Sequence, residues 1–176
     1  INVKDKTGIT TSVELISGKF EEKESPAAPP NSWANDINNH FAVWIINLKS
    51  KGSFLIPKTI LGINRSLYIL KNTNIQVNDD SIDPHSMVEL FSEQNVILKN
   101  NGHDTRILML QGRPINEPIE RYGPFVMNTR SEIQEAFLDY NRTGFGGWKW
   151  PSSGPIHGQY KGRFAKLING EIDKPT

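Results

Sequence analysis

The stretch LMLQGRPINEPIERYGPFVMNTRSEIQEAFLDYNRTGFGGW, residues 108–148, joins a strand-like run to a helix through a long segment without regular periodicity. The connecting part, residues 112–129, holds three prolines and two glycines. Prolines fix φ and bias the preceding residue toward extended conformations, and Gly112 and Gly123 permit sharp turns. Such a segment loses less entropy on ordering than a generic loop. We therefore expect a defined linking strap over residues 112–127.

A helix is predicted directly after the strap, over residues 128–143. Thr129 and Glu132 have the spacing of a capping box, in which each side chain binds the other residue's backbone amide. The apolar positions recur at i, i+3, i+4 and i+7 and are Ile133, Ala136, Phe137 and Tyr140. Gly144 is a candidate left-handed cap. This amphipathic face is expected to pack on the outer wall of the preceding domain or on another domain.

The residues before the strap are rich in short apolar and β-branched runs. The expected strands lie at 8–20, 41–49, 53–57, 66–73, 75–78, 87–91, 95–100 and 104–112. About eight short strands with no helix between them predict a β-sandwich or barrel, with an open antiparallel sheet as the alternative.

Local pairings can also be predicted from these runs. Residues 41–49 are almost continuously apolar, which is typical of a strand buried on both faces. The turn after them predicts a hairpin over 41–57, and 66–78 predicts a second strand pair. The sequence NNGHD at 100–104 has the Asn-Gly of a tight hairpin turn. Residues 21–39, with three prolines, are expected to form a long exposed loop.

Residues 144–176 form a tail rich in glycine, tryptophan and proline. We expect irregular structure in which Trp148 and Trp150 are anchors. The last stretch, from residue 165, is expected to fray or to pair briefly.

Composition excludes several classes of function. The net charge of +1 and the mixed distribution of charges argue against direct nucleic-acid binding. The absence of cysteine excludes disulfides, thiolate metal sites and thiol catalysis in this chain. The longest apolar run, residues 41–48, is too short to span a bilayer. These features favour a cytoplasmic protein that does not bind membranes.

No residue pattern predicts a catalytic, cofactor-binding or metal site. Two metal ligands on one strand are expected in His-x-His spacing, which is absent. The four histidines are dispersed at His40, His85, His103 and His157. His85, Glu89 and His103 are the least unfavourable metal ligands. Glu117 and Glu120 could be an acid/base pair, but the favoured interpretation is that Glu117 binds backbone amides or an arginine and fixes the strap.

Residues 108–148 resemble the C-terminal domain of the pirin family. There a strand ends in Gly-x-Pro, followed by Glu-Pro and by Tyr-Gly-Pro-Phe-Val-Met-Asn-Thr before a helix. The matching positions here are Gly112, Pro114, Glu117, Pro118 and 122–129. The resemblance implies an all-β fold. Its parts would be a cupin-type β-barrel (a double-stranded β-helix or jelly roll) at 1–127, one C-terminal amphipathic helix at 128–143 and the tail at 144–176.

Pirin-like proteins are bicupins, and the resemblance implies a second cupin. In the family the N-terminal cupin holds iron or another divalent metal through histidines and a glutamate. No such motif is present here, and the chain starts at Ile1 rather than at a methionine. We therefore expect a metal-bearing N-terminal cupin upstream, outside this chain, and no cofactor within it. A short single-cupin protein is the alternative.

The favoured function is a metal-free structural and interaction module that packs on the N-terminal cupin and binds further protein partners. Full-length relatives include quercetin 2,3-dioxygenases and redox-responsive regulators of transcription. One alternative is therefore part of a quercetin 2,3-dioxygenase-type metal-dependent oxygenase, and another is a small-molecule-binding cupin. The chain alone is not expected to be an active enzyme.

Overall fold

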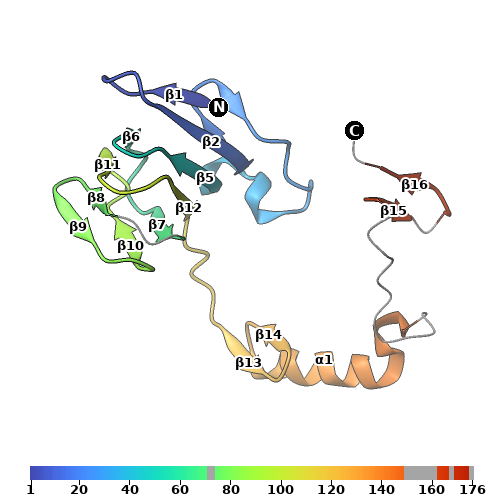
Figure 1. Cartoon of the computed structure of the whole chain (residues 1–176). Helices are drawn as coiled ribbons and strands as arrows, with labels where there is room; N and C mark the ends of the chain where they lie inside the picture. Colours follow the sequence, from blue (N-terminus) through green and yellow to red (C-terminus); the bar gives the residue numbers. More distant parts are fainter. Residues whose placement is uncertain (71–73, 149–161, 167–168, 175–176) are drawn as a thin grey trace. The chain divides into compact units, whose positions relative to one another are not determined.

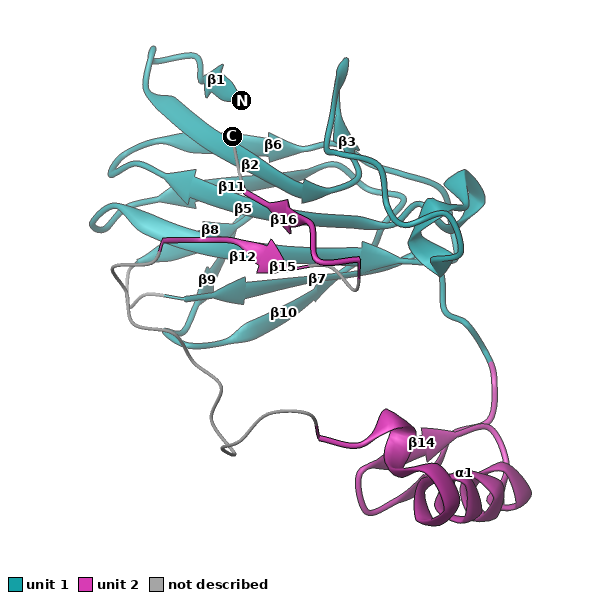
Figure 2. Ribbon diagram, turned by 90° about the vertical axis from the view of Figure 1, so that its right-hand side faces the viewer, with its two compact units in different colours: residues 1–116 teal, residues 117–176 magenta. Residues whose placement is uncertain are grey.

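Strands provide most of the regular structure in the computed structural model, which describes residues 1–70, 74–148, 162–166 and 169–174 (Figure 1). The chain divides into two compact units, residues 1–116 and residues 117–176 (Figure 2). The strands of unit 1 are β1 (Asn2–Lys4), β2 (Thr10–Ser17), β3 (Lys19–Phe20), β4 (Lys23–Glu24), β5 (Ala42–Leu48), β6 (Ser53–Ile56), β7 (Asn64–Ile69), β8 (Ile75–Val77), β9 (Asp80–Ile82), β10 (Met87–Leu90), β11 (Val96–Asn100) and β12 (Thr105–Gly112).

Unit 1 contains two antiparallel sheets that share one core. The larger sheet has the order β1-β2-β5-β12-β7-β10, and the smaller sheet has the order β6-β11-β8-β9. The short strands β3 and β4 pair separately as a small hairpin. Alternate residues of both sheets point into the common core, for example Ile46 and Leu67 from the larger sheet and Leu98 from the smaller one. The all-β prediction of a sandwich or barrel is confirmed, and the open single sheet is excluded.

The chain crosses repeatedly from one sheet to the other, and three predicted local pairings are therefore wrong. β5 pairs with β2 and β12, whereas β6 pairs with β11, so residues 41–57 are not a hairpin. Likewise β7 and β8 lie in different sheets. The bend at 100–104 leads from β11 in the smaller sheet to β12 in the larger sheet. This alternation is the connectivity of a jelly roll.

The predicted loop at residues 21–39 is more structured than expected. It begins with β4 and contains two 3-10 turns, η1 (Trp33–Asn35) and η2 (Ile37–Asn39). Ser32 and Asp36 cap these turns through their side chains. The second turn is tied to the end of β12, because Arg113 donates from its backbone N to Asn39 O at 2.9 Å and from Nε to Asn38 O at 2.9 Å.

Gly18 illustrates how closely the backbone packs at the end of β2. A bulge separates Leu15 from Ser17 in the pairing of β2 with β5. Gly18 then adopts φ +84°, and a Cβ at this position would lie 2.5 Å from Phe41 O. The position therefore requires glycine both for its backbone conformation and for space.

Unit 2 is built on the predicted helix, which the structure confirms as α1 (Arg130–Thr143). Both hydrogen bonds of the capping box are present, and Gly144 ends the helix in the left-handed conformation at φ 57°. The other elements in the described part of unit 2 are β13 (Glu120–Tyr122), β14 (Phe125–Met127), the 3-10 turn η3 (Gly144–Gly146), β15 (Ala165–Lys166) and β16 (Ile172–Asp173).

The helix packs on a hairpin that the strap itself forms. β13 and β14 pair around Gly123, which has φ 56°. The Phe137 ring contacts the Phe125 ring at 4.7 Å and the Tyr122 ring at 5.5 Å between centroids. Ile133 and Ala136 are buried as predicted, but Tyr140 is 51% exposed. The sequence did not identify this hairpin as the partner of the helix.

The described part of the tail contains one short strand pair. β15 pairs with β16, as expected for a brief pairing in the last stretch. Trp148, predicted as an anchor, is 62% exposed, and Trp150 lies outside the described residues. None of the helices in the described part of the chain combines the length and the apolar character that a membrane crossing needs.

Candidate functional site

The three histidines in the described part of the chain do not gather into a site. His40 ends η2 with φ 47°, and its ring Nδ1 lies 3.3 Å from Thr59 Oγ1. His85 occupies an exposed turn with φ 59°, and His103 is exposed in the bend between β11 and β12. Glu89 points outward from β10, whereas His157 lies outside the described residues. Across the described ranges, no three histidine, aspartate or glutamate side chains are placed to hold a metal ion.

The two acidic residues of the strap have separate structural partners. Glu117 Oε2 accepts a hydrogen bond from Asn128 Nδ2 at 2.7 Å. Glu120 Oε2 lies 3.7 Å from Arg130 Nε. Both contacts join the strap to the start of α1. They support the interpretation in which Glu117 fixes the strap, although its partner is a side-chain amide rather than a backbone amide or an arginine.

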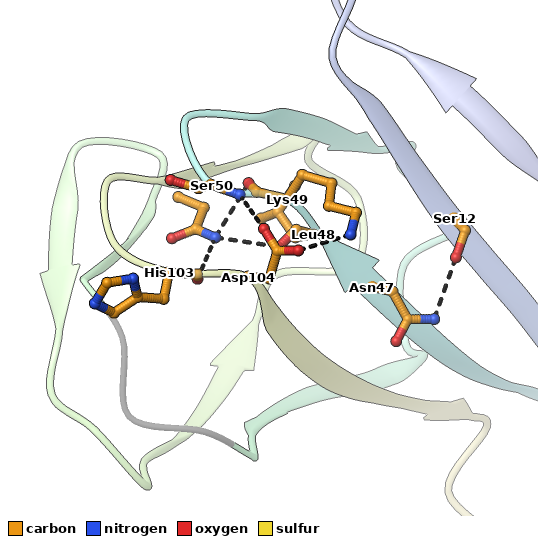
Figure 3. Close-up of polar contacts among 8 residues, drawn as sticks. Ser12, Asn47, Leu48, Lys49, Ser50, His103 and Asp104 are labelled. Atoms are coloured by element: carbon orange, nitrogen blue, oxygen red, sulfur yellow. Dashed lines mark hydrogen bonds and ion pairs between the residues drawn. The ribbon is translucent and has the colours of Figure 1, made fainter.

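A polar cluster joins the β5–β6 and β11–β12 connections (Figure 3). The buried Asn100 side chain donates from Nδ2 to the carbonyl oxygens of Leu48, Lys49 and His103. Asp104 accepts from Lys49 Nζ at 2.6 Å and from Ser50 N at 2.9 Å. The Lys49 hydrogen bond is the main reason why the pKa of Asp104 is lowered. The cluster satisfies backbone groups where the chain changes sheets, so we interpret it as structural.

The interior of unit 1 is filled with apolar side chains. Trp44, Leu67 and Met109 from the larger sheet are at most 3% exposed, as is Phe54 from the smaller sheet. The Phe20 and Trp44 rings meet edge to face, with centroids 5.2 Å apart. Trp44 Nε1 is buried without a hydrogen-bond partner, which reflects its apolar surroundings. Among the described residues, this interior holds no carboxylate or imidazole side chain as a ligand for a metal ion.

Arg65 is the only charged residue among the buried residues of the described structure, and no sequence pattern singled it out. It is 4% exposed and is paired in register with Gln111 on the neighbouring strand. Arg65 Nε donates to Gln111 Oε1 at 2.7 Å, and Gln111 Nε2 donates to His40 O at 2.7 Å. The signal was present in the alternation of β7, because Arg65 shares its inward face with Leu67 and Ile69.

The outer face of the larger sheet carries a group of apolar side chains beside polar ones such as Asn47, Arg106 and Glu89. Ile45, Leu108, Tyr68 and Met87 follow one another across β5, β12, β7 and β10 in register. Val43 and Leu110 form an adjacent outward pair. Met87 is 49% exposed, Leu110 38% and Tyr68 37%. We call this set the outer apolar face. The predicted two-sided apolar character of residues 41–49 therefore continues onto the neighbouring strands.

Unit 2 carries an open groove of about 690 Å³ on the helix surface. Met127, Leu138 and Phe145 supply its apolar part. Two of its acidic side chains are already occupied, because Glu132 serves the helix cap and Asp139 pairs with Arg142 at 2.8 Å. Nothing in this groove points to a particular ligand.

Comparisons with known proteins agree with this fold. Residues 43–146 match the sequence model of the family described as the Pirin C-terminal cupin domain. A Pseudomonas aeruginosa protein provisionally named as a quercetin 2,3-dioxygenase is 47% identical over 130 residues, which cover 73% of this chain and 44% of that protein. Pirin of Rattus norvegicus is 40% identical over 110 residues, which cover 58% of this chain and 37% of the relative.

Comparison with a solved structure also supports this fold. The crystal structure of a quercetin 2,3-dioxygenase from Acinetobacter baumannii superposes with a TM-score of 0.66 at 30% identity, covering 82% of this chain and 46% of that one. The chain thus spans less than half the length of these relatives. The family match includes β5 to β12, the strap and α1, which are the elements that define the fold described above. The chain therefore belongs to the pirin family, as a C-terminal cupin domain.

Proposed function

We propose that this chain is a metal-free structural and interaction module that packs on an N-terminal metal-binding cupin of the same protein. The observation that carries the proposal is the outer apolar face. An antiparallel sheet with one solvated face normally alternates apolar inward residues with polar outward residues. Here Ile45, Leu108 and Tyr68 point outward while their neighbours fill the core. Such a sheet is suited to being covered on both sides.

Side chains of the outer apolar face keep exposed surface that a docked domain would cover. Fully burying a large apolar side chain stabilises an interface by about 1.5–3 kcal/mol. Met87, Leu110 and Tyr68 each retain more than a third of their surface. By contrast, the outer face of the smaller sheet has only the neighbouring pair Leu55 and Ile97 in this register, beside Lys99 and Ser53. The larger sheet is therefore the better docking surface.

The metal of the assembled protein is assigned to the partner cupin. The described donor set does not fit a metal centre, because the three described histidines lie in separate turns and no carboxylate or imidazole is buried in the described interior. Iron or another divalent metal would accordingly be held by the N-terminal cupin. We also place the protein in the cytoplasm, which the cysteine-free sequence supports.

Metal analysis and binding measurements test this proposal. The purified chain, incubated with Fe²⁺, Ni²⁺, Zn²⁺ or Mn²⁺ and then desalted, should retain no ion at one per chain. Its binding partner in calorimetry is the part of the Pseudomonas aeruginosa relative that lies outside the matched segment. Met87→Lys should weaken binding by about tenfold or more, because it places a charge in a desolvated interface.

Leu55→Lys is the matched control for the binding measurement. Leu55 is 50% exposed and Met87 is 49% exposed, but they lie on the outer faces of different sheets. The control should bind like the unmodified chain. Equal effects of the two substitutions would reject the docking surface, and one tightly held ion per chain would reject the metal-free assignment.

The alternative is that the assembled protein is a quercetin 2,3-dioxygenase-type oxygenase and that this cupin completes its site. The names of the Pseudomonas aeruginosa and Acinetobacter baumannii relatives favour this alternative. The test is quercetin turnover by a complex of this chain with the metal-loaded N-terminal part of the relative. Turnover that requires both parts would promote the alternative, and turnover by the N-terminal part alone would leave this chain a structural role.

A further inference from the structure

Arg65 is a buried cation whose side chain is only partly satisfied. A guanidinium has five N–H donors. Nε donates to Gln111 Oε1 at 2.7 Å, and Nη1 donates to Pro57 O at 2.8 Å. Two donors are thus used. One N–H on Nη1 and both on Nη2 have no acceptor among the described residues.

The charge of Arg65 also lacks a counter-ion within the described structure. Every aspartate and glutamate side chain of the protein lies in the described residues, and none is within ion-pair distance of Arg65. Burial lowers the pKa of the Arg65 guanidinium, but an arginine side chain keeps its proton in proteins. Buried charges are normally paired, because an unpaired one is costly to desolvate.

The guanidinium is held in place while part of it stays accessible. Gln111 is itself fixed by its hydrogen bond to His40 O, and Pro57 supplies a rigid second acceptor. The fully buried, unpaired polar side-chain atoms of the described residues are Thr11 Oγ1, Trp44 Nε1 and Thr105 Oγ1. Arg65 Nη2 is not among them, so it retains contact with solvent. A planar guanidinium that is held in one orientation and keeps free N–H groups is preorganised to bind an oxyanion.

We propose that Arg65 binds an oxyanion, a carboxylate or a phosphate group, through Nη1 and Nη2 at the end of the unit 1 sandwich where β7, β12 and Pro57 meet. Carboxylates and phosphates match the two parallel N–H bonds that a guanidinium offers. Nη2 supplies two donors and Nη1 one, while the bonds to Gln111 and Pro57 hold the plane of the group. This proposal is independent of the docking role, because Arg65 faces inward whereas the outer apolar face points away from the core.

The first test is a titration followed by NMR of the Arg65 side chain. Acetate and inorganic phosphate are the probes, and sodium chloride keeps the ionic strength constant. Binding should move the Arg65 Nε–Hε resonance in a saturable manner with either probe. The probe that binds with the higher affinity shows whether the site prefers a carboxylate or a phosphate group. A resonance that does not move with acetate or phosphate, or that moves equally with chloride, would overturn the proposal.

Variants provide the second test. The same anions should raise the melting temperature of the unmodified chain and of Arg106→Gln, an exposed arginine on the opposite face of β12. Arg65→Lys retains the positive charge but loses the paired N–H donors of the guanidinium, and should weaken anion binding by about tenfold. Arg65→Gln should abolish the anion-dependent shift. An identical shift in Arg65→Gln and Arg106→Gln would contradict the site, and the NMR titration decides the matter if Arg65→Gln fails to fold.

Discussion

Five hydrogen bonds converge on the carboxylate of Asp5, in the turn between β1 and β2. Oδ1 accepts from the Thr7 amide, the Thr7 hydroxyl and the Ile9 amide, and Oδ2 accepts from the Ser53 amide at 2.9 Å. The Thr7 hydroxyl and the Ser53 amide are the main causes that lower the pKa of Asp5 to about 2. One side chain thereby joins the edge of the larger sheet to the first residue of β6.

Asp5 should make folding stability depend on pH below about 4. Its pKa is lower in the folded state than in the unfolded state, so the unfolded chain binds more protons. The stabilisation is complete above the ordinary aspartate pKa of 3.8 and is lost as pH falls toward about 2. Asp5→Asn should reduce this slope and also lower stability at neutral pH, because it replaces an acceptor by a donor. Urea unfolding across the acid range measures both effects.

Asp83→Asn is the control for the Asp5 experiment. Asp83 is exposed and has no hydrogen bond or ion pair among the described residues. This variant should follow the unmodified chain at every pH. Part of the slope should survive in Asp5→Asn, because the pKa of Asp104 is also lowered. An unchanged slope in Asp5→Asn would show that the Asp5 hydrogen bonds do not differ between the folded and unfolded states.

The contacts of single residues were predictable where a local sequence pattern indicates the contacting residue. The partnership of Thr129 with Glu132 follows from their spacing alone, and the structure contains it. The partner of Glu117 could not be named, because Asn128 approaches it only after β13 and β14 have paired. Arg65 belongs to no local sequence pattern that indicates a partner. Its inward position follows from alternation in β7, but its missing counter-ion is visible only in three dimensions.

The start of α1 depends on the capping box. Glu132 Oε2 accepts from the Thr129 amide at 2.7 Å, and Thr129 Oγ1 accepts from the Glu132 amide at 3.2 Å. Thr129→Ala should therefore destabilise the helix by about 1 kcal/mol. Hydrogen exchange of the amides in the first turn of α1 measures the loss. Ser131→Ala, inside the helix and without a capping role, should leave these amides as protected as before. Equal exchange in the two variants would mean that the hairpin, not the cap, fixes the helix start.

At the scale of elements, the sequence predicts which segments form strands but not which strands pair with each other. Each expected strand from residue 41 onward has a counterpart close to its predicted bounds. The errors concern partners, as in β5 with β6 and β7 with β8. A short connection between two apolar runs is compatible with a hairpin and with a crossing between packed sheets. The choice is made by long-range packing, such as the pairing of β5 with β12, about 60 residues away along the chain.

At the scale of the molecule, the same core serves both sheets of unit 1. Met109 is paired in register with Trp44 and Leu67 in the larger sheet, and it belongs to the cluster that includes Phe54 and Leu98 from the smaller sheet. The sequence predicts such a core through the alternation of its strands. It does not identify the proposed partner of the outer apolar face, because apolar outward residues do not specify the surface that would contact them.

The shared core predicts that the two sheets unfold together. Met109 is fully buried, so Met109→Ala should lower the free energy of unfolding by about 2–5 kcal/mol. Amides of β11, in the smaller sheet, should lose as much protection in hydrogen exchange as amides of β5 in the larger sheet. Met87→Ala makes the same chemical change at a half-exposed position and should cost about 0.5 kcal/mol. A Met109→Ala protein in which β11 keeps its protection while β5 loses it would show that each sheet is stable by itself. That outcome is not expected from the jelly-roll connectivity, because the chain alternates between the two sheets and neither sheet is formed by one continuous segment.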